Sequence, residues 1–570
     1  MNLETEYSIH WLLDIIKKIE KRNPEKITLA TGKTPSGHIH IGILREIIIC
    51  DSLRRVFEEK NNEVRSYLFL DSLDAAKRFP EYIKKSFQKK HIGKPFCFIP
   101  CPFDDCGCES YAFHFGNELV STFNDFGIDN KIIWTHELYR TNEMIEKIKI
   151  ALNNTEKIKQ ILKKFILPTL DEEKKDQFLE TQKDWMPVMA VCRKCHKIQA
   201  RDNDGTIIPN RIISYDKNNE QITYKCPACG FEEVLSIYEG NLKLNWRVDW
   251  PAKWAIFKTT CEPAGKDHCV KGGSYDTGLE ICQDIFGYKG PIKVPYEWLR
   301  LGERDMKTSK GIVFTPKNYL KIADPEIFRT LILRTNPMKH ISFRIEELPQ
   351  YHDYFEKMEN IYYSLEEAES KEEGDYYNFM YPLTKIDEIP KEKKNRLSFN
   401  LLIFLSQIQN ILSFDKIYEK AKEIMIENKF ENIINKNQFK KLLEKTKNWI
   451  EEIKKIIEEE QDKKTKRRIQ QKITLFSIPE EISLDLKKQL EENQKKGIKY
   501  LREYLLQTED LDADKIQNKI FSIAKDQLNM PPKKLFQAIY KILIGKKYGP
   551  RLGPFLKMLD KDWLIERLNI

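Results

Sequence analysis

Two histidines stand two residues apart in "TGKTPSGHIHIGILRE", residues 31–46, among glycine, proline and serine residues. Apolar runs flank this stretch, so we expect a turn between a strand and a helix. Free backbone N–H groups at the start of a helix can bind phosphate, and the imidazoles of His38 and His40 can donate hydrogen bonds to it. A P-loop is excluded, because Ile27 stands where that motif has its first glycine. The alternative is a tight turn carrying two surface histidines.

A second polar stretch, "ERDMKTSKGIVFTPKNYL" at residues 303–320, contains Met306, Ser309 and Lys310 before an apolar run. An ammonium and a hydroxyl on one loop can bind pyrophosphate and stabilise the charge that develops on it. Taken alone, the stretch fits a solvated basic loop better. Its pairing with the histidine turn favours a nucleotide site.

Cysteines and one histidine form two candidate metal clusters. Cys192, Cys195, Cys226 and Cys229 make two CxxC pairs, which is typical of tetrahedral structural zinc. A second group could hold another zinc ion or consist of free thiols, and it comprises Cys101, Cys106, Cys108 and His114.

The elements that position these residues alternate between helices and strands. We expect helices at residues 8–22, 41–59, 110–127 and 142–164, and strands at residues 26–30, 64–70 and 131–135. This order predicts a Rossmann-type parallel α/β sheet. The CxxC pairs mark an inserted module, residues 241–330 look rich in loops, and long Lys/Glu/Ile/Leu helices after about residue 350 predict an all-α C-terminal part.

Composition narrows the class of protein. The 570 residues are 41% hydrophobic and 32% charged, with a net charge of +9, which suits a polyanionic partner without requiring one. Neither a membrane span nor a signal peptide is evident, so we expect a cytoplasmic protein. Basic clusters at residues 463–468 and 545–551, with Tyr548 in the second, are candidate contacts to nucleic acid.

Several stretches resemble a known family. "HIGI" at residues 40–43 and "DMKTS" at residues 305–309 are similar to the "HIGH" and "KMSKS" motifs of class I aminoacyl-tRNA synthetases. "TPSGHIHIG", "WRVDWPAKWAIF" and "GGSYDTG" narrow the resemblance to class I lysyl-tRNA synthetases, and it runs through nearly the whole chain. The resemblance implies activation of L-lysine with ATP and magnesium, transfer to tRNA(Lys), and a monomer.

The resemblance also implies roles for individual residues. The catalytic residues would be His40, Ser309 and Lys310, and the ATP-binding residues Gly37, His40, Gly42, His268, Met306 and Lys310. The lysine-binding residues would be Gly32, Thr34, Glu46, Trp246, Asp249 and Tyr275. The lysine ammonium needs a carboxylate and its methylene chain an aromatic wall. Glu46 and Asp249 are both candidates for that carboxylate, and a packed aromatic core with an Asp–Arg pair is the alternative reading of "WRVDW".

The domain order implied by the resemblance is a Rossmann catalytic domain in two halves, a zinc-binding insertion, a connecting domain and a helical anticodon-binding domain. These parts correspond to residues 1–175 and 241–300, 176–240, 301–355, and 356–570 respectively.

Two positions depart from the family motifs. Ile43 replaces the last residue of "HIGH", and Asp305 replaces the first lysine of "KMSKS". They leave open a catalytically weakened paralogue that binds tRNA without charging it. A different amino acid substrate, such as glutamate, would require a basic pocket, and the sequence suggests none.

Overall fold

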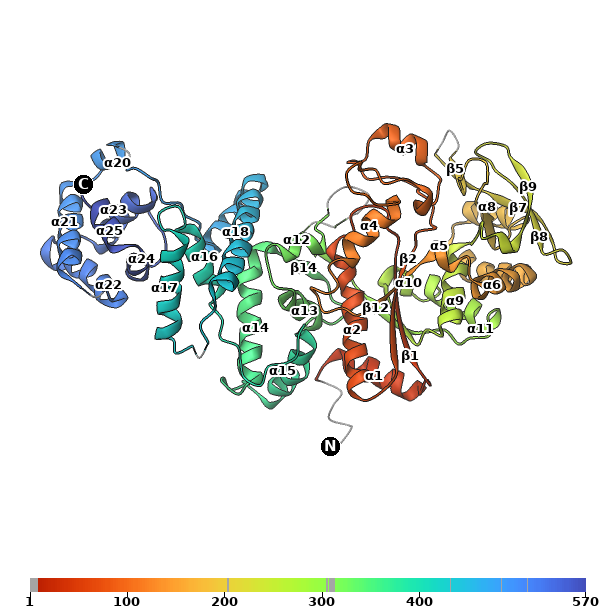
Figure 1. Ribbon diagram of the computed structural model, residues 1–570, viewed down its shortest axis with the longest axis horizontal. Coiled ribbons are helices and arrows are strands. Elements are labelled where there is room, and N and C mark those ends of the chain that lie inside the picture. The colour runs from red at the N-terminus through yellow and green to blue at the C-terminus, as the bar shows by residue number, and fades with distance from the viewer. Residues whose placement is uncertain are drawn as a thin grey trace. The chain divides into compact units, whose positions relative to one another are not determined.

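The computed structural model describes residues 9–201, 205–303, 306, 313–430, 432–482, 484–509 and 511–570 (Figure 1). The chain forms two compact units. The first comprises residues up to 320, with 324–344 and 354–389, and the second comprises 390–570 with 321–323 and 345–353.

A five-stranded sheet in the order β12-β11-β1-β2-β3 lies at the centre of the first unit, and all its neighbouring strands are parallel. Its strands are β1 (Ile27–Lys33), β2 (Val64–Leu70), β3 (Lys131–Trp134), β11 (Cys261–Gly265) and β12 (Ile292–Tyr296). The chain first adds β2 and then β3 on one side of β1, and later adds β11 and then β12 on the other side. In such sheets ligands bind beyond the carboxyl ends of the strands, where the strand order reverses.

Helix α2 (Leu44–Glu59) follows β1 through the short 3₁₀ helix η2 (Ile41–Ile43) and is buried along most of its length. Its Asp51 carboxylate lies 2.7 Å from the guanidinium of Arg329 on α13 (Pro325–Leu333), and both side chains are fully buried. Arg54 and Arg55 add ion pairs of 2.7 and 2.9 Å to the same carboxylate. This buried network fixes α2 against α13.

Further helices of the first unit are α1 (Trp11–Arg22), α3 (Lys85–His91), α4 (Tyr111–Val120), α6 (Asn142–Asn153), α7 (Thr155–Ile166), α8 (Glu172–Gln182), α9 (Trp246–Phe257), α10 (Lys266–Cys269) and α11 (Ser274–Asp284). The predicted single helix at 142–164 is wrong, because Asn154 leaves the helical conformation and separates α6 from α7. The predicted helix at 110–127 ends at Val120 as a regular α-helix. The expectation of a loop-rich region at 241–330 is also wrong, since helices α9 to α11 and the strands β11 and β12 of the central sheet lie there.

The stretch that contains the CxxC pairs forms an antiparallel sheet in the order β10-β4-β7-β8-β9. Its strands are β4 (Val188–Ala190), β7 (Arg211–Asp216), β8 (Gln221–Lys225), β9 (Glu232–Ser236) and β10 (Leu242–Leu244). Two shorter pairs are β5 (Gln199–Arg201) with β6 (Ile207–Pro209) and β13 (Leu299–Leu301) with β14 (Ile341–Phe343).

The second unit is built of helices, as predicted for the C-terminal part. They include α16 (Phe399–Gln407), α17 (Phe414–Glu427), α18 (Lys436–Glu459), α19 (Lys463–Lys472), α21 (Glu492–Gln507), α22 (Ala513–Ser522), α23 (Pro532–Ile544), α24 (Leu552–Met558) and α25 (Lys561–Arg567). Leucine and isoleucine side chains from these helices form one apolar core. Among the helices that the structure describes, none is long and apolar enough to cross a bilayer.

Candidate functional site

Two cavities lie at the carboxyl ends of the parallel strands. The larger has a volume of about 680 Å³ and the smaller about 240 Å³. Lys33, the last residue of β1, and Trp246, the first residue of α9, line both cavities. Their shared walls make them neighbouring parts of one site, and the smaller part suits a ligand no larger than a single amino acid.

Of the two histidines in the turn, His40 lines the larger cavity. Burial, and then the nearby ammonium of Lys33, lower the pKa of His40 to about 3, so the imidazole is neutral. Its Nδ1 is buried and has no hydrogen-bond partner within the described part of the chain. The Nδ1 of His38 instead lies 2.7 Å from the Glu118 carboxylate on α4.

Gly42 lies against the ring of His40. A Cβ atom at residue 42 would lie 2.8 Å from the Nδ1 of His40, closer than real side chains approach one another. The absence of a side chain therefore allows the imidazole to occupy its position. The Ile41 N–H, one residue earlier, donates to the Phe314 carbonyl at 2.8 Å and ties the turn to this later segment of the chain.

The lining of the smaller cavity includes buried carboxylates, among them Glu46, and an aromatic wall. The Tyr296 hydroxyl, at the end of β12, donates a hydrogen bond to the Glu46 carboxylate in the first turn of α2. Burial raises the pKa of Glu46 to about 8, against the attraction of Lys33. Trp246 and Trp250 stack with their ring centroids 5.7 Å apart and form the wall.

Asp249 also lines the smaller cavity, but its charge is already compensated. Its carboxylate lies 2.8 Å from the Lys253 ammonium one helical turn later and accepts a hydrogen bond from the Tyr139 hydroxyl. Lys253 reaches Asp71 as well, at 2.5 Å. The Asp–Arg pair considered for "WRVDW" is thus an Asp–Lys pair, and Glu46 is the candidate carboxylate that forms no ion pair among the described residues.

Glu262 is a further buried carboxylate in the lining. It accepts hydrogen bonds from the indole N–H groups of Trp250 at 2.9 Å and Trp254 at 2.6 Å. Burial raises the pKa of Glu262 to about 7. The Tyr275 hydroxyl donates to the backbone carbonyl of Glu262 at 3.1 Å, which places Tyr275 behind the tryptophans and outside both linings.

The structure distributes the predicted residues unevenly. Gly32, Glu46, Trp246, Asp249 and His268 line the smaller cavity, and Thr34, His40 and Met306 line the larger one. Gly37 and Gly42 belong to the turn but not to either lining. Ser309 and Lys310, with Asp305, lie outside the described residues. The lining residues that sequence reasoning missed are Lys33, Asp71, Lys253, Glu262 and Tyr296.

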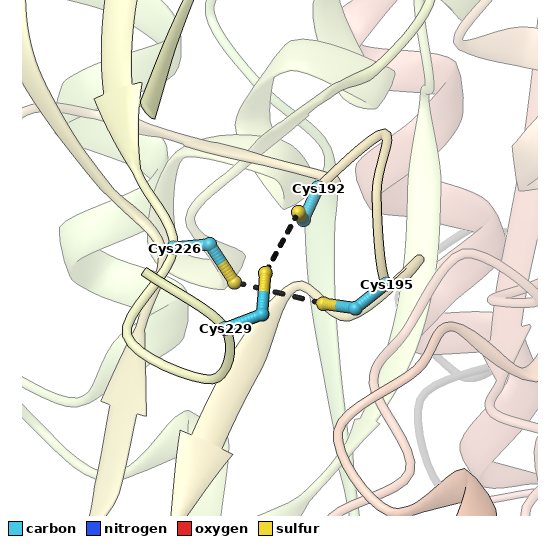
Figure 2. Close-up of side chains that lie close together, drawn as sticks. All are labelled: Cys192, Cys195, Cys226 and Cys229. Atoms are coloured by element: carbon cyan, nitrogen blue, oxygen red, sulfur yellow. Dashed lines mark hydrogen bonds between the residues drawn. The ribbon is translucent and has the colours of Figure 1, made fainter. Parts of the chain in front are cut away.

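The four cysteines of the CxxC pairs converge at one point (Figure 2). The Sγ atoms of Cys192 and Cys229 are 3.7 Å apart, and those of Cys195 and Cys226 are 3.6 Å apart. Four thiolates at about 2.3 Å from a tetrahedral zinc ion would be separated by about 3.8 Å, whereas a disulfide needs about 2.05 Å. The donor set and its spacing therefore fit zinc.

The second cluster is less complete. Cys101, Cys106 and His114 bring their ligand atoms together, with His114 Nδ1 at 3.7 and 3.3 Å from the two sulfurs. The Cys101 and Cys106 sulfurs are 2.9 Å apart, closer than two thiolates bound to one zinc ion. The Cys108 thiol instead donates to the Cys106 carbonyl at 3.8 Å.

Comparisons with known proteins agree with one another. A family profile described as "tRNA synthetases class I (K)" matches residues 9–387, and one described as "Anticodon binding domain" matches residues 441–570. A lysine–tRNA ligase of Methanocaldococcus jannaschii is 36% identical and covers 99% of this chain and 100% of its own length. One from Methanococcus maripaludis is 33% identical, with the same coverage of both chains. A solved glutamate–tRNA ligase from Elizabethkingia meningosepticum aligns with a TM-score of 0.39 at 14% identity, covering 95% of this chain and 98% of its own.

Proposed function

The chain belongs to the class I tRNA synthetases of the lysine type, and from this membership we propose that it is a lysine–tRNA ligase. It would activate L-lysine with ATP to lysyl-adenylate and pyrophosphate, and then transfer the lysyl group to the 3′ end of tRNA(Lys). The observation that carries this proposal is the pair of neighbouring cavities at the switch point of the sheet, one of which is lined by Glu46.

We assign the smaller cavity to lysine. The ammonium lies against the Glu46 carboxylate and the Tyr296 hydroxyl, and the methylene chain lies along Trp246. A desolvated carboxylate without an ion-pair partner gains most from binding an ammonium group. Glutamate is disfavoured, because its side-chain carboxylate would lie beside Glu46 in the same cavity.

The larger cavity would bind ATP. Neutral His40 donates a hydrogen bond to a phosphate oxygen, and Met306 contacts the nucleotide. The lysine carboxylate attacks the α-phosphorus, and pyrophosphate leaves with the developing charge on its oxygens. Ser309 and Lys310 would stabilise that charge, and magnesium would bind together with ATP. A ribose hydroxyl of the tRNA then attacks the aminoacyl carbonyl and AMP leaves.

We further propose that residues 176–240 are a zinc-binding insertion held by Cys192, Cys195, Cys226 and Cys229. When bound, zinc would cross-link the two CxxC turns and stabilise the fold of the insertion. Cys101, Cys106 and His114 are proposed as a second site, with the Cys108 thiol needing a new rotamer to join. Metal analysis of the purified protein tests both: one zinc per chain supports the first site alone, and two support both.

The comparisons favour the ligase over the weakened paralogue, since relatives that match this chain along its full length are lysine–tRNA ligases. Ile43 is buried and lines the smaller cavity, where an apolar side chain can contact the methylene chain of lysine. Asp305 is the departure that favours reduced activity. ATP–pyrophosphate exchange with a panel of amino acids separates the two. Exchange with lysine alone supports the ligase, whereas no exchange together with retained tRNA binding supports the paralogue.

A further inference from the structure

Lys33 is the last residue of strand β1, and its backbone is held by the central sheet. Strand β1 lies between β11 and β2. The Cα atom of Lys33 pairs with that of Leu70 at the end of β2, and the Lys33 carbonyl accepts the Asp71 N–H at 3.0 Å. The point from which the Lys33 side chain extends is therefore set by the sheet and not by the turn that follows.

The Lys33 side chain lies where the two cavities of the candidate site meet. Within the described part of the chain, the two linings share only Lys33 and Trp246. Because an indole has no charge, Lys33 is the cation that these linings have in common. A bond formed between one ligand in the larger cavity and another in the smaller cavity would form beside this ammonium.

Other cations of the linings are already paired. The Lys253 ammonium lies 2.5 and 2.8 Å from the carboxylates of Asp71 and Asp249, and the Lys243 ammonium lies 3.0 Å from a third carboxylate. Lys33 is partly buried, and its ammonium forms neither an ion pair nor a hydrogen bond with any residue that the structure describes. A partly desolvated ammonium without a partner gains most from binding an anion.

The charge of Lys33 acts on one functional residue in each cavity. In the larger cavity it helps to keep His40 neutral, and in the smaller cavity it attracts the Glu46 carboxylate. Burial lowers the pKa of Lys33 itself, and the attraction of Glu46 opposes that change. Negatively charged oxygens of bound ligands would oppose it further and favour the ammonium form.

We propose that Lys33 is a further catalytic residue, whose ammonium contacts the lysine carboxylate and the α-phosphate of ATP where the two substrates meet. This inference rests on the proposed ligase function. A carboxylate oxygen bonds to the α-phosphorus, the bond from that phosphorus to the oxygen bridging to the β-phosphate breaks, and pyrophosphate leaves with the electron pair. Both reactants are anions, so the ammonium reduces their repulsion and stabilises the charge on the oxygens around phosphorus. Lys33 keeps its proton throughout.

The competing role for Lys33 is electrostatic support of Glu46. In that case the loss of its charge would alter the binding of lysine and leave the rate at saturating lysine unchanged. A catalytic contact instead lowers the rate at saturating concentrations of both substrates, because it is strongest in the transition state. The division of the effect between kcat and KM therefore separates the two roles.

Substitution of Lys33 by methionine, which has a similar length and no charge, tests the proposal. In lysine-dependent ATP–pyrophosphate exchange, Lys33→Met should have a kcat about 100-fold or more below that of the wild type, as expected when one stabilising group is lost. The KM values for lysine and ATP should each change by less than about fivefold. Lys33→Arg, which restores a cation, should recover part of the lost kcat. Lys26→Met alters an exposed lysine just before the same strand, at its opposite end, and should match the wild type.

Binding provides a readout that does not require turnover. Lysyl-sulfamoyl adenosine, an analogue of lysyl-adenylate, spans both cavities and carries an acidic sulfamoyl group in place of the phosphate. Calorimetry should show that Lys33→Met raises the Kd for this analogue about tenfold or more, because a charge-assisted contact is lost. The Kd values for lysine and for ATP, measured separately, should change less than that for the analogue.

Two results would overturn the proposal. One is a kcat of Lys33→Met within about threefold of the wild type, including a loss confined to the KM for lysine, which would assign Lys33 to the support of Glu46. The other is an analogue that binds the variant as tightly as the wild type. Wild-type exchange is measured in parallel: its absence would refute the ligase function, while the analogue would still show whether Lys33 lies between the two ligands.

Discussion

Replacement of Glu46 by glutamine tests the assignment of the lysine ammonium. Glutamine keeps an oxygen that can accept the Tyr296 hydroxyl but removes the negative charge. Removing one charged partner of a buried, hydrogen-bonded pair costs about 3 kcal/mol. That free energy corresponds to a rise in the KM for lysine on the order of 100-fold.

The assay is lysine-dependent ATP–pyrophosphate exchange at about pH 8.5, where the Glu46 carboxyl of the wild type, whose pKa is about 8, is largely ionised. The KM for ATP should change little in Glu46→Gln, because Glu46 lines only the smaller cavity. Norleucine, which lacks the side-chain ammonium of lysine, should inhibit the wild type and the variant about equally. Glu59→Gln, at an exposed position on the same helix, is the matched control.

A KM for lysine within about threefold of wild type in Glu46→Gln would refute the reasoning, since it corresponds to less than ~0.7 kcal/mol. An equal rise in the KM values for lysine and ATP would refute it as well. Either result would mean that another carboxylate binds the lysine ammonium, and Glu262 would be the next residue to substitute.

Three further perturbations test other contacts. Burial raises the pKa of Glu46 to about 8, and a bound lysine ammonium lowers that pKa. Lysine binding below pH 8 should therefore release a proton, and the Kd for lysine should fall as the pH rises toward 8. Calorimetry in buffers of different ionisation enthalpy measures the number of protons released. Gly42→Ala should reduce the kcat of exchange about tenfold or more with little change in the KM for lysine, because the new Cβ displaces the neighbouring imidazole. Asp51→Asn leaves Arg329 buried without its charged partner and should destabilise the first unit by about 3–5 kcal/mol in denaturant unfolding, whereas an unchanged midpoint would mean that the network contributes little.

The parts of the fold that could be predicted from the sequence are those that local residue patterns determine. The predicted strand at 64–70 is observed with the same bounds, because an apolar run followed by a polar turn defines a buried parallel strand without reference to the rest of the chain. Helix α9 was missed because Pro251 lies inside it, and sequence reasoning treats an internal proline as a helix breaker.

In the candidate site, too, local sequence patterns predict some of the contacts and not others. Cysteine spacing predicts which four thiols converge, since the two pairs are visible in the sequence. The pairing of Asp249 with Lys253 could have been found from their separation of one helical turn. Glu262 and Tyr296 could not, because their positions beside Glu46 depend on the order β12-β11-β1 of the strands, and no local pattern specifies that order.

Arg45 stands next to Glu46, and its guanidinium donates to the carbonyls of Glu297, Pro337 and Lys339 at 2.6, 2.9 and 2.8 Å. It thereby joins the helix that bears Glu46 to the residue after Tyr296 and to the segment before β14, whose partner strand β13 directly follows Trp298 in the lining of the larger cavity. Binding of a ligand in one cavity should consequently change the affinity of the other cavity for its ligand. By linkage, lysine and ATP would then each change the affinity for the other by the same factor.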